Sequence, residues 1–351
     1  MTQKILWCVD ISTVKTDRVI YRGWQLELFL YSMIEKGGIA QEDICVTCYM
    51  KDLENSFLPQ YYNEIFSLFP KVKISFDVDL GYNPLYNTMD RGLVDYCAIN
   101  KAGTLISVHR NGYNVGYDVI ALLDLDAYMF GKANFDAYPT VTTLTNYPPM
   151  DPEQCCRVTT GLQGQKPWAD ADYFSDLWGN PWTGIDLTKI MEAIKVPEAN
   201  LEMIKAGSYN VFIAQEDFTE ELVYGFQYFT IAIKSLCAAA GHPHIWQAEM
   251  GAYPLALASY GVDFELGTGP EINDCAWNWD VPEGSLCTYA FDGFSIHNGS
   301  SFRKGHYMDR TPFSDERLIE QGLEKSNCDA ELAFYEYCRE IKTNHLITRE
   351  A

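Results

Sequence analysis

The sequence has no long hydrophobic run and comparatively few basic residues. No window approaches the roughly eighteen consecutive apolar residues that a membrane-spanning helix needs, and the N-terminal stretch MTQKILWCVDIS has no A-x-A cleavage site. We therefore expect an unsecreted protein without a membrane partner. The 351-residue chain has 26 basic and 48 acidic residues, a net charge of −22. This balance argues against a surface for nonspecific binding of nucleic acid or anionic lipid, but leaves room for a local basic groove.

Recognisable cysteine patterns are also scarce, although the chain has 11 cysteines. Cys45 and Cys48 form a C-x-x-C inside an expected strand, and no second pair completes a zinc site. Cys155 and Cys156 are adjacent, which is not zinc spacing either. Because a secretion signal is missing, we expect reduced, mostly buried thiols in a cytoplasmic protein, in the host cytoplasm if the protein is viral. We find no internal repeat and no low-complexity segment.

What the sequence does contain is an alternation of strands and helices. This β-α-β-α-β order predicts an α/β fold of the Rossmann type, in which a mostly parallel sheet carries helices on both faces. Nucleotides bind such sheets at the carboxyl ends of the strands. The expected strands cover residues 4–11, 44–49, 72–76 and 119–123, and the expected helices cover residues 21–36, 56–70 and 91–111.

Beyond residue 130 the chain becomes irregular. Residues 146–185 are rich in Pro, Gly, Trp and Asp, a composition typical of long binding loops. A turn and strand at 207–212 and helices at 218–241 and 244–260 follow, and after Pro312 an acidic helix pair is expected to pack on the surface. We divide the chain into a nucleotide-sugar-binding half (1–145) and an acceptor and metal-completing half (146–310) of one domain, followed by a helical tail (311–351).

The strand at 119–123 runs directly into Asp124-Leu125-Asp126. In an extended chain the two carboxylates point to the same side, and Leu125 turns into the sheet. Two carboxylates on one rim suit Mn²⁺ or Mg²⁺ with open positions for phosphate oxygens. An Asp-x-Asp also arises by chance, so the alternative is a solvated turn after a buried strand. Its place at the end of a fourth strand favours the metal site.

Three further residues have both a functional and an ordinary interpretation. His297 follows an apolar run and is either a core histidine or a third metal ligand. Glu249 lies in an apolar helix and is either solvent-facing or held in a cleft, where it would contact sugar hydroxyls or a developing oxocarbenium ion. Lys304 is either a surface charge or a group that assists the departure of a diphosphate.

Four short islands of sequence carry a family resemblance. They are Gly23–Gln25, Ala98–Lys101, Leu122–Asp126 and Ile245–Tyr253, the last followed by Phe294–His297. In this order they resemble the hydroxyproline O-arabinosyltransferases and the related peptidyl serine galactosyltransferases. Members of that family are retaining transferases with the GT-A fold that use UDP-activated sugars, and the resemblance implies the same fold and donor here. It covers most of residues 1–310, and Glu-Met-x-Ala-Tyr is its most specific part.

The resemblance also implies roles for particular residues. Asp124, Asp126 and His297 are expected to bind Mn²⁺ or Mg²⁺, and Glu249 and Asp124 are expected to act in catalysis. The expected contacts to the UDP-sugar are Trp24, Gln25, Asn100, Lys101, Asp124, Gln247 and Lys304.

Two departures from the family bear on the acceptor. Ala102 follows Lys101 where the pattern usually has Pro, and the membrane helix of familiar members is missing. The missing helix, the acidic charge and the cysteines fit a viral or bacterial relative that moves arabinose, or as a second choice galactose, to an intracellular polymer, whereas the change at Ala102 favours a binding module. The polymer is either a peptide hydroxyl or a hydroxymethylated DNA base flipped into a pocket. The alternative function is a sugar-nucleotide-binding module without turnover. The basic groove that DNA would need could be formed by Arg157, Lys166, Arg303, Lys304 and Arg310.

Overall fold

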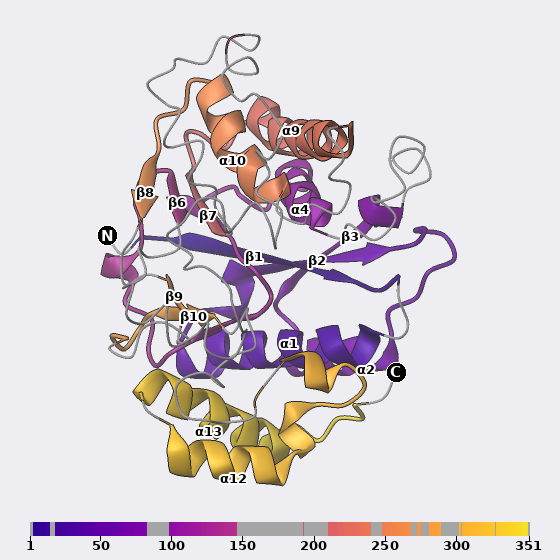
Figure 1. Cartoon of the computed structure of the whole chain (residues 1–351), viewed down its shortest axis with the longest axis vertical. Helices are drawn as coiled ribbons and strands as arrows, with labels where there is room; N and C mark the ends of the chain where they lie inside the picture. Colours follow the sequence, from indigo (N-terminus) through magenta and orange to yellow (C-terminus); the bar gives the residue numbers. More distant parts are fainter. Residues whose placement is uncertain are drawn as a thin grey trace.

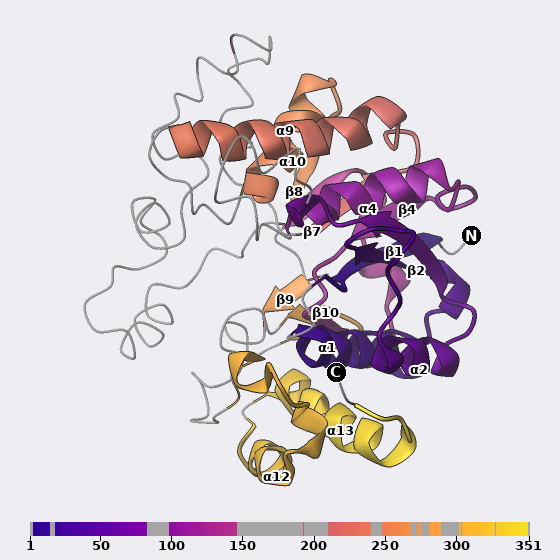
Figure 2. The same cartoon turned by 90° about the vertical axis from the view of Figure 1, so that its right-hand side faces the viewer.

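The computed structural model has a central sheet between two layers of helices (Figure 1). Two helices close to the C-terminus form an additional layer below, and Figure 2 shows the same layers from the side. The structure describes residues 3–14, 18–82, 98–145, 192, 210–239, 248–267, 272–274, 281–288, 302, 304–326 and 328–349.

The central sheet has seven strands in the order β3-β2-β1-β4-β7-β6-β8. β1 pairs in parallel with β2 and β4, and β2 with β3, whereas β7 runs antiparallel to both β4 and β6. This arrangement confirms the predicted α/β class with a mostly parallel sheet. The strands are β1 (Ile5–Ser12), β2 (Ile44–Met50), β3 (Lys73–Val78), β4 (Val119–Leu122), β6 (Thr143–Thr145), β7 (Asn210–Ala214) and β8 (Glu265–Gly267).

The middle strands are buried on both faces. In β1, Trp7 and Val9 enter one hydrophobic core while Leu6 and Cys8 enter the other, and β4 alternates in the same way. Strands covered on both sides have no solvent-facing positions, so their sequences are nearly continuous apolar runs. This explains why the apolar run before Asp124 is a strand of the sheet centre rather than of its edge.

Helices cover both faces of the sheet (Figures 1 and 2). α1 and α2 lie on one face, and α4, α9 and α10 lie on the other. The helices are α1 (Val19–Tyr31), α2 (Gln60–Leu68), α4 (Ile99–Arg110), α9 (Glu220–Ala239), α10 (Ala248–Ser259), α12 (Glu316–Lys325) and α13 (Asp329–Asn344).

The expected helix at residues 21–36 changes form near its end. The α-helix stops at Tyr31, and a π-helical turn, Ser32–Lys36, follows. In that turn the Gly37 N–H donates to the Ser32 carbonyl at 2.8 Å, and the Ser32 hydroxyl accepts the Met129 N–H at 3.0 Å. The wider turn therefore connects the helix to β5 (Ala127–Met129), a strand of a second sheet. That sheet has the order β5-β10-β9, with β9 at Ile272–Asp274 and β10 at Leu286–Thr288.

The expected C-terminal helix pair is confirmed, but it is more than a surface addition. Phe334, Cys338 and Ile341 of α13 are fully buried in the same core as α1. The Trp24 indole N–H on α1 also donates to the Tyr307 carbonyl at 2.9 Å. The segment after residue 304 therefore completes the core beneath the sheet.

The described cysteines agree with the expectation of free thiols. None of the six forms a disulfide, and five of them are buried. Cys45 and Cys48 lie three residues apart on β2, so their side chains enter opposite cores. They therefore cannot share a metal ion.

Candidate functional site

The candidate site lies where the order of the strands reverses. The chain builds β1, β2 and β3 outward in one direction and then returns to place β4 on the other side of β1. In open α/β sheets, the crevice at such a switch point, beyond the carboxyl ends of the strands, is the usual ligand site. Asp10 lies near the carboxyl end of β1, and Asp124 follows that of β4.

Asp124 is held by the backbone of its own loop. The Leu123 N–H donates to the Cys8 carbonyl at 2.9 Å, and the Asp124 N–H donates to the Asn210 side-chain carbonyl at 2.8 Å. Its carboxylate forms an ion pair with the Lys101 ammonium on α4. Three elements therefore fix this aspartate: β1, the start of β7 and α4.

The expected extended geometry of Asp124-Leu125-Asp126 is wrong. The strand ends at Leu122, and residues 125 and 126 form a turn before β5. Leu125 is buried as expected, because it packs into the core that contains α1. The turn sends the chain from the large sheet to the small one, so the two carboxylates meet different cations rather than a common side of one strand.

Asp126 pairs with Lys304 across a long stretch of sequence. The Lys304 ammonium lies 2.5 Å from one carboxylate oxygen, Oδ2. The other oxygen, Oδ1, is buried and has no hydrogen-bond partner among the described residues. Since a buried carboxylate oxygen is costly to leave unpaired, this atom marks a place for a further positive group or hydrogen-bond donor.

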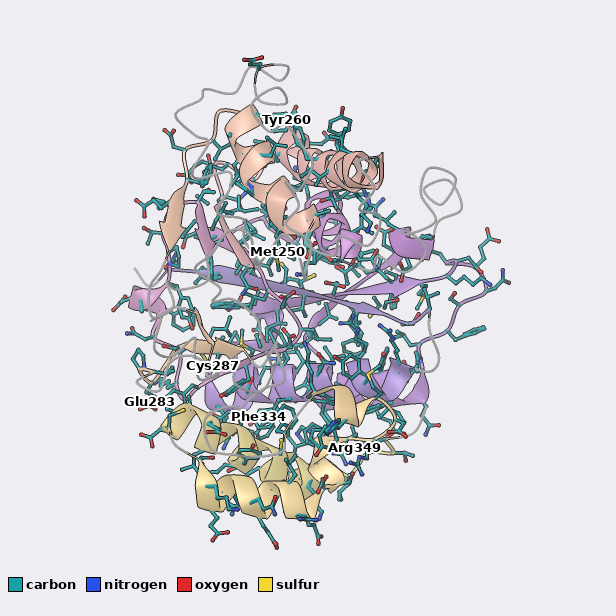
Figure 3. The ribbon with its side chains drawn as sticks, in the orientation of Figure 1. Met250, Tyr260, Glu283, Cys287, Phe334 and Arg349 are labelled. Atoms are coloured by element: carbon teal, nitrogen blue, oxygen red, sulfur yellow. The ribbon has the colours of Figure 1, made fainter. Side chains whose placement is uncertain are left out.

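Glu249 belongs to the same cluster. It lies in the first turn of α10, is 1% exposed, and has one oxygen 3.5 Å from the Lys101 ammonium. The solvent-facing interpretation of Glu249 is therefore wrong. Its neighbour Met250 lies at the end of α10 that is nearer to the sheet (Figure 3). Lys101 thus bridges Asp124 and Glu249, and its pKa is raised because these two charges outweigh its burial.

The acidic groups of the cluster repel one another. Burial raises the pKa of Asp10 to about 6, with the charges of Asp124 and Asp79 adding to the effect against Arg22 and Lys101. Burial and the neighbouring Asp126 likewise raise the pKa of Asp124, although Lys101 opposes them. Burial opposes ionisation of Asp126 too, but the charge and hydrogen bond of Lys304 outweigh it and lower that pKa. At Asp10 and Asp124, burial therefore outweighs the neighbouring cations.

Two residues of the cluster carried no predicted role. Asp10 could have been predicted as a site residue from the sequence, because it lies near the end of the first strand. Tyr253 lies one helical turn after Glu249, is fully buried, and has no hydrogen-bond partner for its hydroxyl among the described residues. The spacing of four residues on an expected helix places it on the same face as Glu249, which was a usable signal.

Three residues that are expected to contact the UDP-sugar form hydrogen bonds within the protein. Trp24 is fully buried, its N–H is bound to the Tyr307 carbonyl, and its ring meets Phe302 and Tyr307 edge-on. This gives Trp24 a packing role in the structure. Gln25 donates to the Tyr21 carbonyl at 2.8 Å, and the Asn100 side-chain carbonyl accepts the Leu80 N–H at 3.0 Å. Their contacts with a nucleotide stay predictions.

The expected metal site is only partly within the described residues. His297 and Gln247 lie outside them, and inside them no group of three or more His, Cys, Asp or Glu side chains is arranged to hold a metal ion. Asp124 and Asp126 nevertheless suit a divalent cation, because they offer hard oxygen ligands, one of which is a buried oxygen without a hydrogen-bond partner among the described residues. Lys304 would have to give up part of its contact with Asp126 for a cation to bind there.

A cavity of 740 Å³ lies away from this cluster. Ala214, which lines it, pairs with Val119 at the start of β4, opposite to the end that leads to Asp124. Its walls combine Tyr260 and Phe264 with several carboxylates, and none of the predicted site residues lines it. We take the carboxylate and lysine cluster as the candidate site, because the switch point and the ion pairs coincide there.

Comparisons with family models and with curated proteins gave no match to this sequence. Among the helices that the structure describes, none has both the length and the hydrophobicity needed to cross a lipid bilayer.

Proposed function

We propose that the protein is a metal-dependent retaining glycosyltransferase of the GT-A type that transfers a sugar from a UDP-sugar to a hydroxyl group. The observation that carries this proposal is the buried cluster at the switch point, in which Asp124 and Asp126 each pair with a lysine. The carboxylates suit a cation, and the Lys304 ammonium suits the diphosphate that comes with it. A site that binds both is what a sugar-nucleotide transferase needs.

The residues divide into two groups in this proposal. Asp124 and Asp126 would hold Mn²⁺ or Mg²⁺ with His297 as the expected third ligand, and the bound ion would act as a Lewis acid on the departing diphosphate. Lys304, already 2.5 Å from Asp126, would turn to a phosphate oxygen when that carboxylate binds the cation. Lys101 would stay between Asp124 and Glu249 and hold both carboxylates in place.

Glu249 is assigned to the sugar side of the site. Retention through front-side attack breaks the bond from the anomeric carbon to the diphosphate and forms the bond to the acceptor oxygen on the same face, with the acceptor proton passing to the diphosphate. Such a reaction needs positioning more than a strong base. A buried carboxylate such as Glu249 can bind sugar hydroxyls and stabilise positive charge that develops at the anomeric carbon.

Isothermal titration of UDP in the presence of Mn²⁺ tests the metal assignment. Asp126→Ala should abolish the metal-dependent part of UDP binding, because it removes a proposed ligand. Asp136→Ala, an exposed aspartate on a 3-10 helix, is the matched control and should bind UDP like the wild type. Undiminished metal-dependent binding in Asp126→Ala would contradict the assignment.

Turnover separates the transferase from a binding module. Transferases usually hydrolyse their donor slowly, so UDP should be released from UDP-arabinose or UDP-galactose without an acceptor. Donor binding with no release across a panel of UDP-sugars would favour the module.

Donor sugar and acceptor are proposed on the family resemblance. Arabinose is favoured over galactose, and the acceptor is a peptide hydroxyl or a hydroxymethylated DNA base. Incubation with UDP-arabinose, Mn²⁺ and either hydroxymethylcytosine DNA or a hydroxyproline peptide, followed by mass spectrometry, shows which polymer gains a pentose. Affinity for a DNA acceptor should also fall steeply with salt, whereas that for a peptide should hardly change.

A further inference from the structure

Tyr253 has a buried hydroxyl group with no hydrogen-bond partner among the described residues. Its side chain is fully buried on α10. A phenol hydroxyl donates one hydrogen bond and accepts others, and a buried one without a partner costs free energy. Either the missing hydrogen bond is an accident of packing, or a ligand supplies it when it binds.

The position of the Tyr253 ring supports the second explanation, that a ligand supplies the hydrogen bond. The Tyr253 ring meets Phe226 of α9 edge-on, with centroids 5.2 Å apart and an interplanar angle of 79°. This contact holds the ring from the side of α9. On α10, Tyr253 follows Glu249 by four residues, so both side chains lie on the same helical face. The charges that act on its hydroxyl are those of Lys101, Glu249, Asp124 and Asp10, the members of the candidate site.

We propose that Tyr253 is a further substrate-contacting residue, whose hydroxyl binds a hydroxyl group of the donor sugar. This inference rests on the proposed glycosyltransferase function. The sugar is chosen over the diphosphate because Tyr253 shares its helical face with Glu249, whereas Lys304 and Asp126 form the pair assigned to the diphosphate and cation. A neutral phenol among carboxylates suits a sugar hydroxyl, which can accept from the phenol and donate to Glu249.

Tyr253→Phe is a direct test, because it removes one oxygen atom and keeps the ring. Titration calorimetry with Mn²⁺ should show affinity for UDP-arabinose or UDP-galactose about 10-fold lower than in the wild type, on the scale of one lost hydrogen bond. Affinity for UDP alone should stay within about 2-fold, since UDP lacks the donor sugar that Tyr253 is proposed to bind. The midpoint of urea unfolding should be unchanged or higher, because the variant loses a buried group that has no internal partner.

Tyr62→Phe is the matched control. Tyr62 on α2 is also fully buried, and its hydroxyl also has no partner among the described residues, but it lies in the core on the other face of the sheet. This variant should bind UDP-sugars like the wild type. A loss of UDP-sugar affinity in both variants would overturn the assignment to Tyr253.

The remaining outcomes are distinct. Equal affinity of the wild type and Tyr253→Phe for UDP-sugars would overturn the inference and leave the proposed function standing. A lower unfolding midpoint in Tyr253→Phe would also overturn it, because the hydroxyl would then have a partner within the protein. Failure of the wild type to bind any UDP-sugar would overturn the inference and the proposed function together.

Discussion

Asp10 shows what it costs to bury an acidic side chain at one end of a sheet. Burial disfavours its charged form, and although the charges of Arg22 and Lys101 exceed the opposing ones of Asp124 and Asp79, they do not cancel the effect of burial. The ordinary pKa of an aspartate is 3.8, whereas that of Asp10 is raised to about 6. At neutral pH the free protein therefore holds a carboxylate whose charge burial disfavours, and a bound cation would stabilise that charge.

We expect Asp10→Asn to stabilise the free protein at neutral pH. In the unfolded chain Asp10 ionises first, so folding stability falls as pH rises from about 4 to about 6 and stays lower above that. A pKa shift of this size lowers the free energy of unfolding by up to about 3 kcal/mol. The amide of the variant does not ionise, so the variant avoids this loss. Urea unfolding of variant and wild type should therefore diverge at pH 7.5 and converge at pH 4. A variant that is destabilised equally at both pH values would contradict this account of Asp10.

For Glu249→Gln we expect turnover to fall by at least about 100-fold, the usual scale for a lost electrostatic group. The amide keeps the size of the side chain but removes the charge that is proposed to face the donor sugar. UDP affinity should stay within a few-fold, because Glu249 is assigned away from the diphosphate. Steady-state donor hydrolysis and UDP titration measure the two effects separately, and near-normal turnover would remove Glu249 from the catalytic group.

At the scale of elements, the packing of α1 on α2 depends on a missing side chain. A Cβ atom at Gly23 of α1 would overlap the ring of Tyr61 on α2. That ring cannot swing aside without cost, because the Tyr61 hydroxyl donates to the buried carboxylate of Glu27 at 2.7 Å. The two helices therefore approach closely at Gly23, one of the positions that the family resemblance singled out.

Gly23→Ala should destabilise the protein by about 1–3 kcal/mol, the usual cost of overpacking a core. Gly305→Ala provides the control, because a Cβ there would meet no atom within 4 Å. Urea unfolding of both variants measures the difference. Equal stability of the two would show that α1 and α2 can move apart without loss.

Much of the central sheet could be predicted from the sequence. The strands expected at 4–11, 44–49 and 72–76 are observed at Ile5–Ser12, Ile44–Met50 and Lys73–Val78, because buried strands leave clear apolar runs. The three-residue strands β5 and β6 are too short to show a period. The antiparallel direction of β7 is set by its pairing with β4 and has no local signal.

The proximity of the motif residues could be predicted better than their geometry. Asp124, Asp126 and Lys101 lie together as the motifs suggested, but the turn at 125 and 126 overrides the alternation of an extended chain. Lys304 meets Asp126 across 178 residues, so only the folded chain shows which lysine pairs with which aspartate. Trp24 illustrates a second limit of sequence-based prediction. An aromatic residue in a motif gives the same sequence pattern whether it binds a ligand or packs in the core, and Trp24 is fully buried.

At the scale of the whole molecule, a buried ionic network joins α1 to the segment after α13. The Glu27 carboxylate on α1 is fully buried and accepts hydrogen bonds from Tyr61 and, through both oxygens, from Arg349. A His345 ring nitrogen lies 2.9 Å from it. Burial alone would raise the pKa of Glu27, but these partners lower it. Arg349, labelled in Figure 3, lies close to α1 and the C-terminal helices.

We expect Arg349→Met to destabilise the protein by about 3–5 kcal/mol at pH 7, because it leaves Glu27 buried without its guanidinium partner. The difference from the wild type should shrink as pH falls, since protonated Glu27 needs no counter-charge. Arg339→Met, an exposed position on α13, should have little effect. Urea unfolding at pH 7 and pH 4.5 tests this, and equal stability of the two variants at pH 7 would contradict it.

The same network has a consequence for synthesis on the ribosome. Glu27 and Arg349 are 322 residues apart in the chain. At about 5–20 residues per second, Arg349 is made roughly 16 to 64 s after Glu27. Throughout that interval α1 carries a carboxylate whose guanidinium partner does not yet exist, on a helix that also presents Trp24 and Leu28. The first helix of the nascent chain can therefore reach its final burial only late, and until then its apolar side chains are available to chaperones.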